Sequence, residues 1–174
     1  MCIRDSIQRN ANDPRRTVTL ARRQERELRD WLYGTSAGPD TLSAAVRAMA
    51  EDVESLHDVR VDAVVVGDRA MDESGVTLLA AVREATVNAA KHAGVHEVSV
   101  FVEVRSGDIE AFVRDRGQGF DRGSVASDRK GISESIESRI ERAGGTAEIE
   151  SSPGRGTEVH LLLPLTHAAD EVAP

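Results

Sequence analysis

The chain has 174 residues, and its composition, 40% apolar and 30% charged, is typical of a soluble globular protein. This length predicts one domain with a short attachment, and the single cysteine excludes a disulfide framework and a cysteine-based zinc site. The net charge is −8, and because residues 1–30 carry eight arginines and five acidic residues, the remainder carries −11. Such an acidic body argues against a nucleic-acid-binding protein, and an aromatic content of 3% argues against base stacking.

The amino-terminal segments are predicted to lie outside the main domain. Residues 1–15 show no periodicity and no apolar core of a signal peptide, so we treat them as a disordered or non-native leader. Residues 16–34 predict a helix with a narrow apolar stripe, closed by Gly34. Either a solvated helix or the end of a coiled-coil element that begins upstream fits this pattern. Residues 35–40 form a linker, and no apolar run reaches the ~20 residues that span a bilayer.

The main domain is predicted to extend over residues 41–166, with a disordered tail at 167–174. Its apolar periodicity predicts the element order α-β-α-β-β-loop-α-β-β, with the loop at 117–130. This order indicates an α+β fold in which helices cover one face of a mixed, mostly antiparallel sheet. The predicted helices span 41–57, 72–93 and 131–143, and the predicted strands span 59–66, 97–105, 108–114, 148–151 and 157–163.

The helix over 72–93 carries a polar stripe opposite its apolar side. Glu84, Asn88 and Lys91 stand at i, i+4 and i+7 and so share a face, and His92 follows them. Such a stripe is most often a solvated surface. Asparagine, however, is a mediocre helix former, and its amide oxygen suits a hard cation surrounded by phosphate oxygens.

A second motif, Asp115-Arg-Gly117-Gln-Gly119, closes a predicted strand. It is not a dinucleotide fingerprint, because Arg122 replaces the third glycine and no helix follows directly. A plain turn is the simple interpretation. The functional one is a pocket that the backbone approaches closely, where a carboxylate accepts a hydrogen bond from an exocyclic amino group such as that of adenine.

Two further glycine-containing stretches are weak signals when taken alone. Lys130-Gly131-Ile132 opens a predicted helix, whose free N–H groups and dipole favour phosphate. The turn over 153–157, which contains Gly156 and Thr157, leads into the last strand. A loop exit and a hairpin turn are the corresponding simple interpretations.

Together, the order and spacing of these motifs resemble the ATP-binding domain of two-component sensor histidine kinases. This domain has the Bergerat fold, a two-layer α/β sandwich of the GHKL group, which includes gyrase, mismatch-repair ATPases and anti-sigma-factor serine kinases. Residues 83–94 (REATVNAAKHAG) resemble the N box, 115–119 the first glycine box, and 131–132 with 154–157 the second. Residues 24–34 (QERELRDWLYG) resemble the segment before this domain in the subfamily paired with helix-turn-helix response regulators.

The resemblance implies a role for each matching residue. Asn88 would bind the Mg²⁺ that bridges the phosphates of ATP, and Glu84 would act as a base or orient the attacking group. Asp115 would accept the adenine amino proton, and residues 117–130 would form a lid. The remaining expected ATP contacts are Lys91, His92 and Lys130 beside the phosphates, Gly117 and Gly119 around the nucleotide, Gly131 and Ile132 at a helix start, and Gly156 and Thr157 on the adenine side.

Two departures from the family pattern stand out. Ser133 and Glu134 replace further glycines after the expected lid, and a carboxylate there is unfavourable near a triphosphate unless it points away. The phospho-accepting histidine is missing, because His57, in the sequence SLHD, is predicted to be a surface residue at a helix end. Autophosphorylation is therefore not expected for this chain.

The resemblance also implies the partners and the setting. They are a dimerisation domain in the same full-length protein, of which residues 16–34 would be a remnant, and a response regulator. The full-length protein would be a cytoplasmic or membrane-anchored homodimer. Two alternatives stay open: an anti-sigma-factor-type serine kinase with the same ATP site, and a non-catalytic ATP-sensing module.

Overall fold

The computed structural model describes residues 40–121 and 127–165, and for residues 127–134 it describes the backbone only. The predicted leader, the helix over 16–34, nearly all of the linker and the predicted tail lie outside the described residues. No helix in the described ranges is long and apolar enough to cross a membrane. In chain order, the elements are α3 (Leu42–His57), β1 (Arg60–Val66), α4 (Glu73–His92), β2 (Glu97–Val104), β3 (Asp108–Asp115), α5 (Ser127–Arg142), β4 (Thr146–Ser152) and β5 (Gly156–Pro164).

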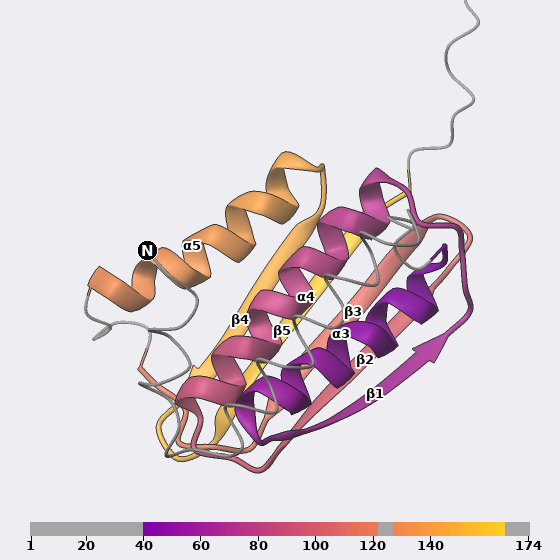
Figure 1. The fold of residues 1–174 in the computed structure, drawn as a ribbon. Coiled ribbons are helices and arrows are strands. Elements are labelled where there is room, and N and C mark those ends of the chain that lie inside the picture. Colours follow the sequence, from indigo (N-terminus) through magenta and orange to yellow (C-terminus); the bar gives the residue numbers. More distant parts are fainter. Residues whose placement is uncertain (1–39, 122–126, 166–174) are drawn as a thin grey trace, which may run out of the picture. The chain divides into compact units, whose positions relative to one another are not determined.

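The five strands form one mixed sheet in the order β1-β2-β3-β5-β4. Only β1 and β2 run parallel, and every other neighbouring pair is antiparallel. Helices α3, α4 and α5 all lie on one face of this sheet (Figure 1). The predicted fold class, a two-layer sandwich with a mostly antiparallel sheet, is therefore confirmed.

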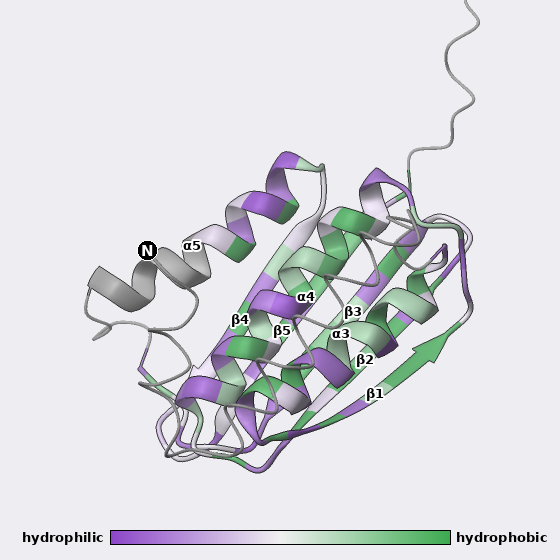
Figure 2. Cartoon of the chain, viewed as in Figure 1, coloured by the Kyte–Doolittle hydropathy of each residue, from purple (hydrophilic) through white to green (hydrophobic). Residues whose placement is uncertain are grey.

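The core lies between the helices and the inner face of the sheet. On β2 the alternation of side chains buries Val98, Val100 and Val102, while Glu97 and Ser99 point outward. Leu78 and Val82 of α4 are fully buried against this face. Figure 2 shows the corresponding apolar stripes on the helices and strands. Burial of these alternating positions fixes the strand register, because a slip by one residue would turn the apolar set outward.

Side-chain caps fix where α3 and α4 begin. The hydroxyl oxygen of Thr41 accepts a hydrogen bond from Ala44 N (3.4 Å), and Asp72 Oδ1 accepts one from Gly75 N (2.9 Å). Asp68, in the turn after β1, accepts hydrogen bonds from the backbone N–H and the hydroxyl of Ser43 (3.0 and 2.7 Å). These bonds lower the pKa of Asp68 to about 2. The Asp72 cap thus fixes where α4 begins, and with it the position of the polar stripe.

Six of the predicted elements match the structure within one or two residues, and β4 begins two residues earlier than expected. The start of the last helix was predicted wrongly, because α5 begins at Ser127 and Gly131 lies inside it rather than at its first turn. The sequence pattern treated Gly131 as a helix start, but an isolated glycine within a helix costs only ~1 kcal/mol and the neighbouring residues can continue through it. The expected loop therefore ends before residue 127.

The outer face of the sheet carries a row of paired side chains across four strands. Val64, Phe101, Phe112 and His160 are successive register partners. The rings of Phe112 and His160 stack at 4.3 Å, and His160 Nε2 lies 2.8 Å from a carboxylate oxygen of Glu110. This row, with the acidic side chains around it, lies on the opposite side of the sheet from the helices.

Candidate functional site

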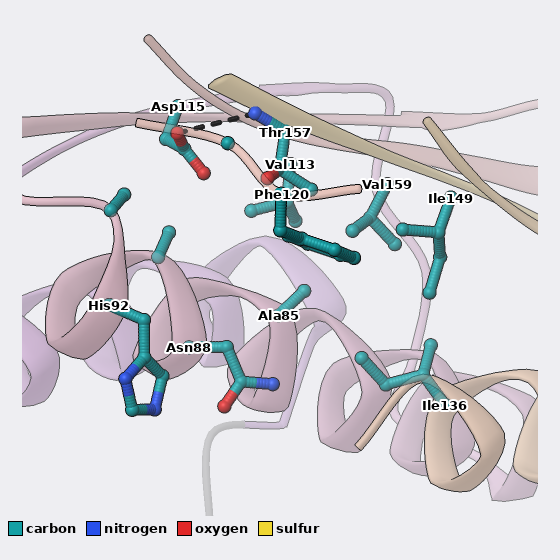
Figure 3. A pocket seen from close by; sticks show the side chains of 13 residues that line it. Ala85, Asn88, His92, Val113, Asp115, Phe120, Ile136, Ile149, Thr157 and Val159 are labelled. Carbon is teal, nitrogen blue, oxygen red and sulfur yellow. Dashed lines mark hydrogen bonds between the residues drawn. The ribbon is translucent and has the colours of Figure 1, made fainter. Parts of the chain in front are cut away.

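A cavity of about 90 Å³ lies between α4 and the inner face of the sheet, at the end of β3. Figure 3 shows its polar side chains, Asp115, Asn88 and His92, together with its apolar walls. It is formed by segments that are far apart in the chain. Its lining residues are Ala85, Asn88, Ala89, His92, Ala93, Val113, Asp115, Gly119, Phe120, Ile136, Ile149, Thr157 and Val159.

Asp115 is the buried charged group of this cavity, with 4% of its surface exposed. Its Oδ1 accepts hydrogen bonds from Gly117 N (2.9 Å) and Thr157 N (3.3 Å), so backbone N–H groups from two separate segments hold one oxygen. The other oxygen points toward the cavity (Figure 3) and has no hydrogen bond within the described part of the chain. A fixed acceptor in an apolar slot suits a flat ring that carries an amino group.

Gly117 and Gly156, one from each of the two glycine boxes, are needed for the packing of the backbone around Asp115. A Cβ on Gly117 would lie 2.1 Å from the carbonyl oxygen of Ala93, and one on Gly156 would lie 2.2 Å from that of Asp115. Gly156 also has a φ of +81°, which L-residues rarely adopt. The resemblance implied that Gly117 and Gly119 leave room for a nucleotide. The structure adds that Gly117 leaves room for the end of α4.

The polar stripe of α4 divides into two parts. Asn88 and His92 line the cavity and lie side by side below it in Figure 3. Glu84 is not among the lining residues, and its carboxylate contacts Ser135 and Arg139 of α5 instead. Lys91 is exposed and does not line the cavity. The structure therefore brings Asn88, His92, Asp115, Gly119 and Thr157 together, with Glu84 and Lys91 at the periphery.

The apolar walls were not predicted as site residues. Val113, Ile149 and Val159 occupy inward positions of β3, β4 and β5, and strand alternation marks them as buried without showing that they face a cavity. Phe120 lies in the loop after β3, where no periodicity applies, and its N–H donates to Ser151 Oγ (2.9 Å). Ile136 of α5 closes the far side.

Three predicted ATP contacts lie in the part of α5 for which only the backbone is described. Lys130, Gly131 and Ile132 all fall within the helix, so the helix-start role expected for Gly131 and Ile132 does not hold.

His57 is the last residue of α3, and the expectation of a helix-end residue is confirmed. Partial burial, and then the positive charges of Lys91 and Arg83, lower the pKa of His57.

Asn88 is the residue with the right chemistry for a metal bridging phosphates. Among the described residues there is no group of three or more histidine, cysteine or acidic side chains that could hold a metal ion by themselves. The Asn88 amide lines the cavity and makes no side-chain hydrogen bond to other described residues, so its oxygen is available. Mg²⁺ takes oxygen ligands, usually keeps several waters and binds few protein groups beside substrate phosphates, so one amide oxygen is compatible with it.

Comparison with known proteins places these residues in context. The family described as histidine kinase-, DNA gyrase B-, and HSP90-like ATPase matches residues 73–167. The oxygen sensor histidine kinase NreB of Staphylococcus carnosus is 35% identical over 130 residues, covering 72% of this chain and 37% of that protein. An uncharacterized sensor-like histidine kinase of Chloroflexus aurantiacus is 34% identical over 90 residues, covering 48% of this chain and 15% of that protein.

Among solved structures, the ATP-binding domain of PrrB from Mycobacterium tuberculosis aligns with a TM-score of 0.58 at 23% identity, covering 74% of this chain and all of that chain. At this identity the similarity shows the fold alone. The chain spans well under half the length of either curated relative.

Proposed function

Because the chain belongs to the family of histidine kinase-, DNA gyrase B- and HSP90-like ATPases, we propose that it is the catalytic, ATP-binding part of a two-component sensor histidine kinase. ATP binding follows from the family. The transfer of the γ-phosphoryl group to a histidine is the proposal, supported by the names of the relatives and by a polar stripe that keeps both Glu84 and Asn88.

The structural observation that supports ATP as the phosphoryl donor is the carboxylate of Asp115 in an apolar slot. Its free oxygen accepts a hydrogen bond from the adenine amino group, and Phe120, Ile136 and Ile149 cover the ring. A 6-oxo purine would place its own acceptor oxygen against this carboxylate and would be repelled. The walls thus supply affinity, and Asp115 supplies the preference for adenine.

The phosphates then extend along α4 toward Asn88 and His92. Asn88 would hold Mg²⁺ through its amide oxygen, and the ion would neutralise the phosphate charge. Lys91, in the last turn of α4, adds positive charge at this end, and the ring of His92 can donate a hydrogen bond to a phosphate oxygen. Lys130, Gly131, Ile132 and Thr157 remain proposed contacts, and Gly117, Gly119 and Gly156 shape the backbone around the base. Glu84 would orient the attacking imidazole or accept its proton.

The acceptor histidine would lie on a dimerisation domain of the same full-length protein, in the cytoplasm. Residues 16–34 would belong to that domain, and residues 41–166 would form the ATPase domain. The phosphoryl group would then pass to a response regulator, which in the proposed subfamily carries a helix-turn-helix output domain.

Phosphotransfer in a mixture tests this function directly. The chain is incubated with γ-³²P-ATP and Mg²⁺, together with a histidine-bearing dimerisation domain from a related kinase. We expect label on that domain, lost in acid because a phosphoramidate bond is acid-labile, and absent when its histidine is replaced by glutamine. Acid-stable label on a serine would favour the serine-kinase alternative, and ATP binding without any transfer would refute the kinase proposal.

The metal has a separate test. Replacement of Asn88 by alanine should remove the Mg²⁺ dependence of ATP affinity in a calorimetric titration and leave adenosine affinity unchanged, because adenosine has no phosphates to bridge. ATP affinity that responds equally to Mg²⁺ in both proteins would remove Asn88 from the metal site.

A further inference from the structure

The polar contacts of Glu84 within the described residues are made with α5 and not with the cavity. Ser135 Oγ and Arg139 Nη2 each lie 3.3 Å from Glu84 Oε2. Ser135 and Arg139 are one turn apart and share a face of α5, and Ile136 between them lines the cavity. One turn of α5 therefore contacts both the proposed base pocket and the proposed catalytic carboxylate.

The pair between Glu84 and Arg139 is partly shielded from solvent. The side chain of Glu84 is 26% exposed and that of Arg139 is 38% exposed, so salt and water screen this pair less than a fully exposed one. Arg139 Nε is buried and has no hydrogen-bond partner among the described residues. Nε and Nη2 form an edge with which a guanidinium can bind a carboxylate bidentately. Of these two donors, only Nη2 binds Glu84.

We propose that Arg139 is a positioning residue for Glu84. The proposal rests on the kinase function proposed above. A free carboxylate beside an incoming triphosphate would be repelled and would turn away. The guanidinium offsets that negative charge and, with Ser135, fixes one carboxylate oxygen, which leaves the other oxygen directed at the attacking group. Arg139 thereby acts through Glu84 and touches neither ATP nor the acceptor.

A double-mutant cycle on the full chain tests this role. The variants are Arg139→Met, which removes the charge but keeps much of the side-chain length, Glu84→Gln, and the two combined. Arg139→Lys retains the charge without the planar fork. Arg142→Met is the matched control, because Arg142 lies on the same helix but is exposed, and its Nε donates to the carbonyl oxygen of Ser138 one turn earlier (2.9 Å). Each protein is assayed for ATP affinity and for phosphotransfer to the supplied dimerisation domain.

We expect Arg139→Met to bind ATP within about twofold of the original chain but to transfer phosphate at least ~10-fold more slowly, since misplaced catalytic groups cost factors of this size. The double variant should be no slower than Glu84→Gln alone, because an arginine that acts only through Glu84 has nothing left to position. Arg139→Lys should recover part of the rate, and Arg142→Met should keep all of it.

Equal transfer by Arg139→Met, or losses that multiply in the double variant, would overturn the proposal. Faster transfer would also overturn it, because it would make the pair an inhibitory contact. Urea unfolding checks that each variant is folded. If Arg139→Met is not folded, Arg139→Lys takes its place in the cycle, and the transfer rate of Arg139→Lys combined with Glu84→Gln is compared with that of Glu84→Gln alone. Failure of the original chain to label any acceptor is a different result, which counts against the kinase function itself.

Discussion

Replacement of Asp115 by asparagine should change which purine the cavity binds while leaving the fold intact. Oδ1 of Asp115 accepts two backbone N–H bonds, from Gly117 and Thr157. The asparagine oxygen can take the same two bonds, because both partners are donors. Its NH₂ group must then occupy the position of the free oxygen and face the cavity. A donor would therefore stand where the adenine amino group requires an acceptor.

The expected loss of ATP affinity follows from the replacement of an acceptor oxygen by an NH₂ donor. A hydrogen bond to a charged group contributes about 1.5–3 kcal/mol, and a mismatched donor leaves the adenine amino group unsatisfied as well. Because each 1.4 kcal/mol is tenfold, the Kd for ATP should rise roughly 10- to 150-fold. ITP, whose 6-oxo group is an acceptor, should lose no affinity and should gain some, so the preference for ATP over ITP should shrink or invert.

Calorimetric titration of both nucleotides into both proteins measures this preference. Asp62→Asn removes the same charge from an exposed position on the outer side of β1 and controls for the change in net charge. An Asp115→Asn protein that binds ATP within twofold of the original, with an unchanged ATP to ITP ratio, would refute the assignment of Asp115 to the base.

The remaining predictions concern stability and are measured by urea or thermal unfolding. Leu78→Ala, at a fully buried position, should lower the free energy of unfolding by about 2–5 kcal/mol, whereas Val76→Ala, 55% exposed, should change it by less than ~0.5 kcal/mol. Asp68→Ala should lower Tm at neutral pH. Because the pKa of Asp68 is lowered from 3.8 to about 2, this difference should be complete above pH 3.8 and vanish as the pH falls through about 2. Gly117→Ala should cost about 1–3 kcal/mol or more, since its Cβ would lie 2.1 Å from a carbonyl oxygen, while Gly107→Ala, with open space around it, should be nearly neutral. Equal losses of stability for Leu78→Ala and Val76→Ala, or for Gly117→Ala and Gly107→Ala, would contradict the packing described above. A decrease in Tm for Asp68→Ala that does not depend on pH would contradict the hydrogen bonds described for Asp68.

Local signals in the sequence were enough to predict most of the fold. The apolar faces of α3 and α4 and the alternation of the strands are properties of neighbouring residues, and the structure agrees with them. The start of α5 was missed because one glycine weakens a helix without ending it. Asn88 and Asp115, which come from two separate motifs, line one cavity, and their roles toward ATP stay predictions.

What the sequence could not predict depends on contacts between distant segments. Arg139 and Glu84 are 55 residues apart, and their ion pair follows from the way α5 packs beside α4. Nothing around Arg139 in the sequence distinguishes it from the other arginines of the same helix. The part of the cavity lined by Ile149 and Val159 similarly depends on the pairing of β4 with β5 at one end of the sheet.

The separation of the two faces of the sheet explains how so acidic a chain can hold a triphosphate. Glu97, Glu103, Glu110 and Glu158 point to the outer face, where Arg60, Arg105 and Arg114 pair with them and no nucleotide is proposed. The inner face contributes mainly apolar side chains to the cavity, and its buried carboxylate lies where we propose that the base binds. With the Glu84 charge paired to Arg139, the phosphates at the proposed position would meet an amide and the basic last turn of α4. Because electrostatic interactions weaken with distance and with screening by water, we expect this local arrangement, and not the net charge of −8, to set the affinity for phosphate.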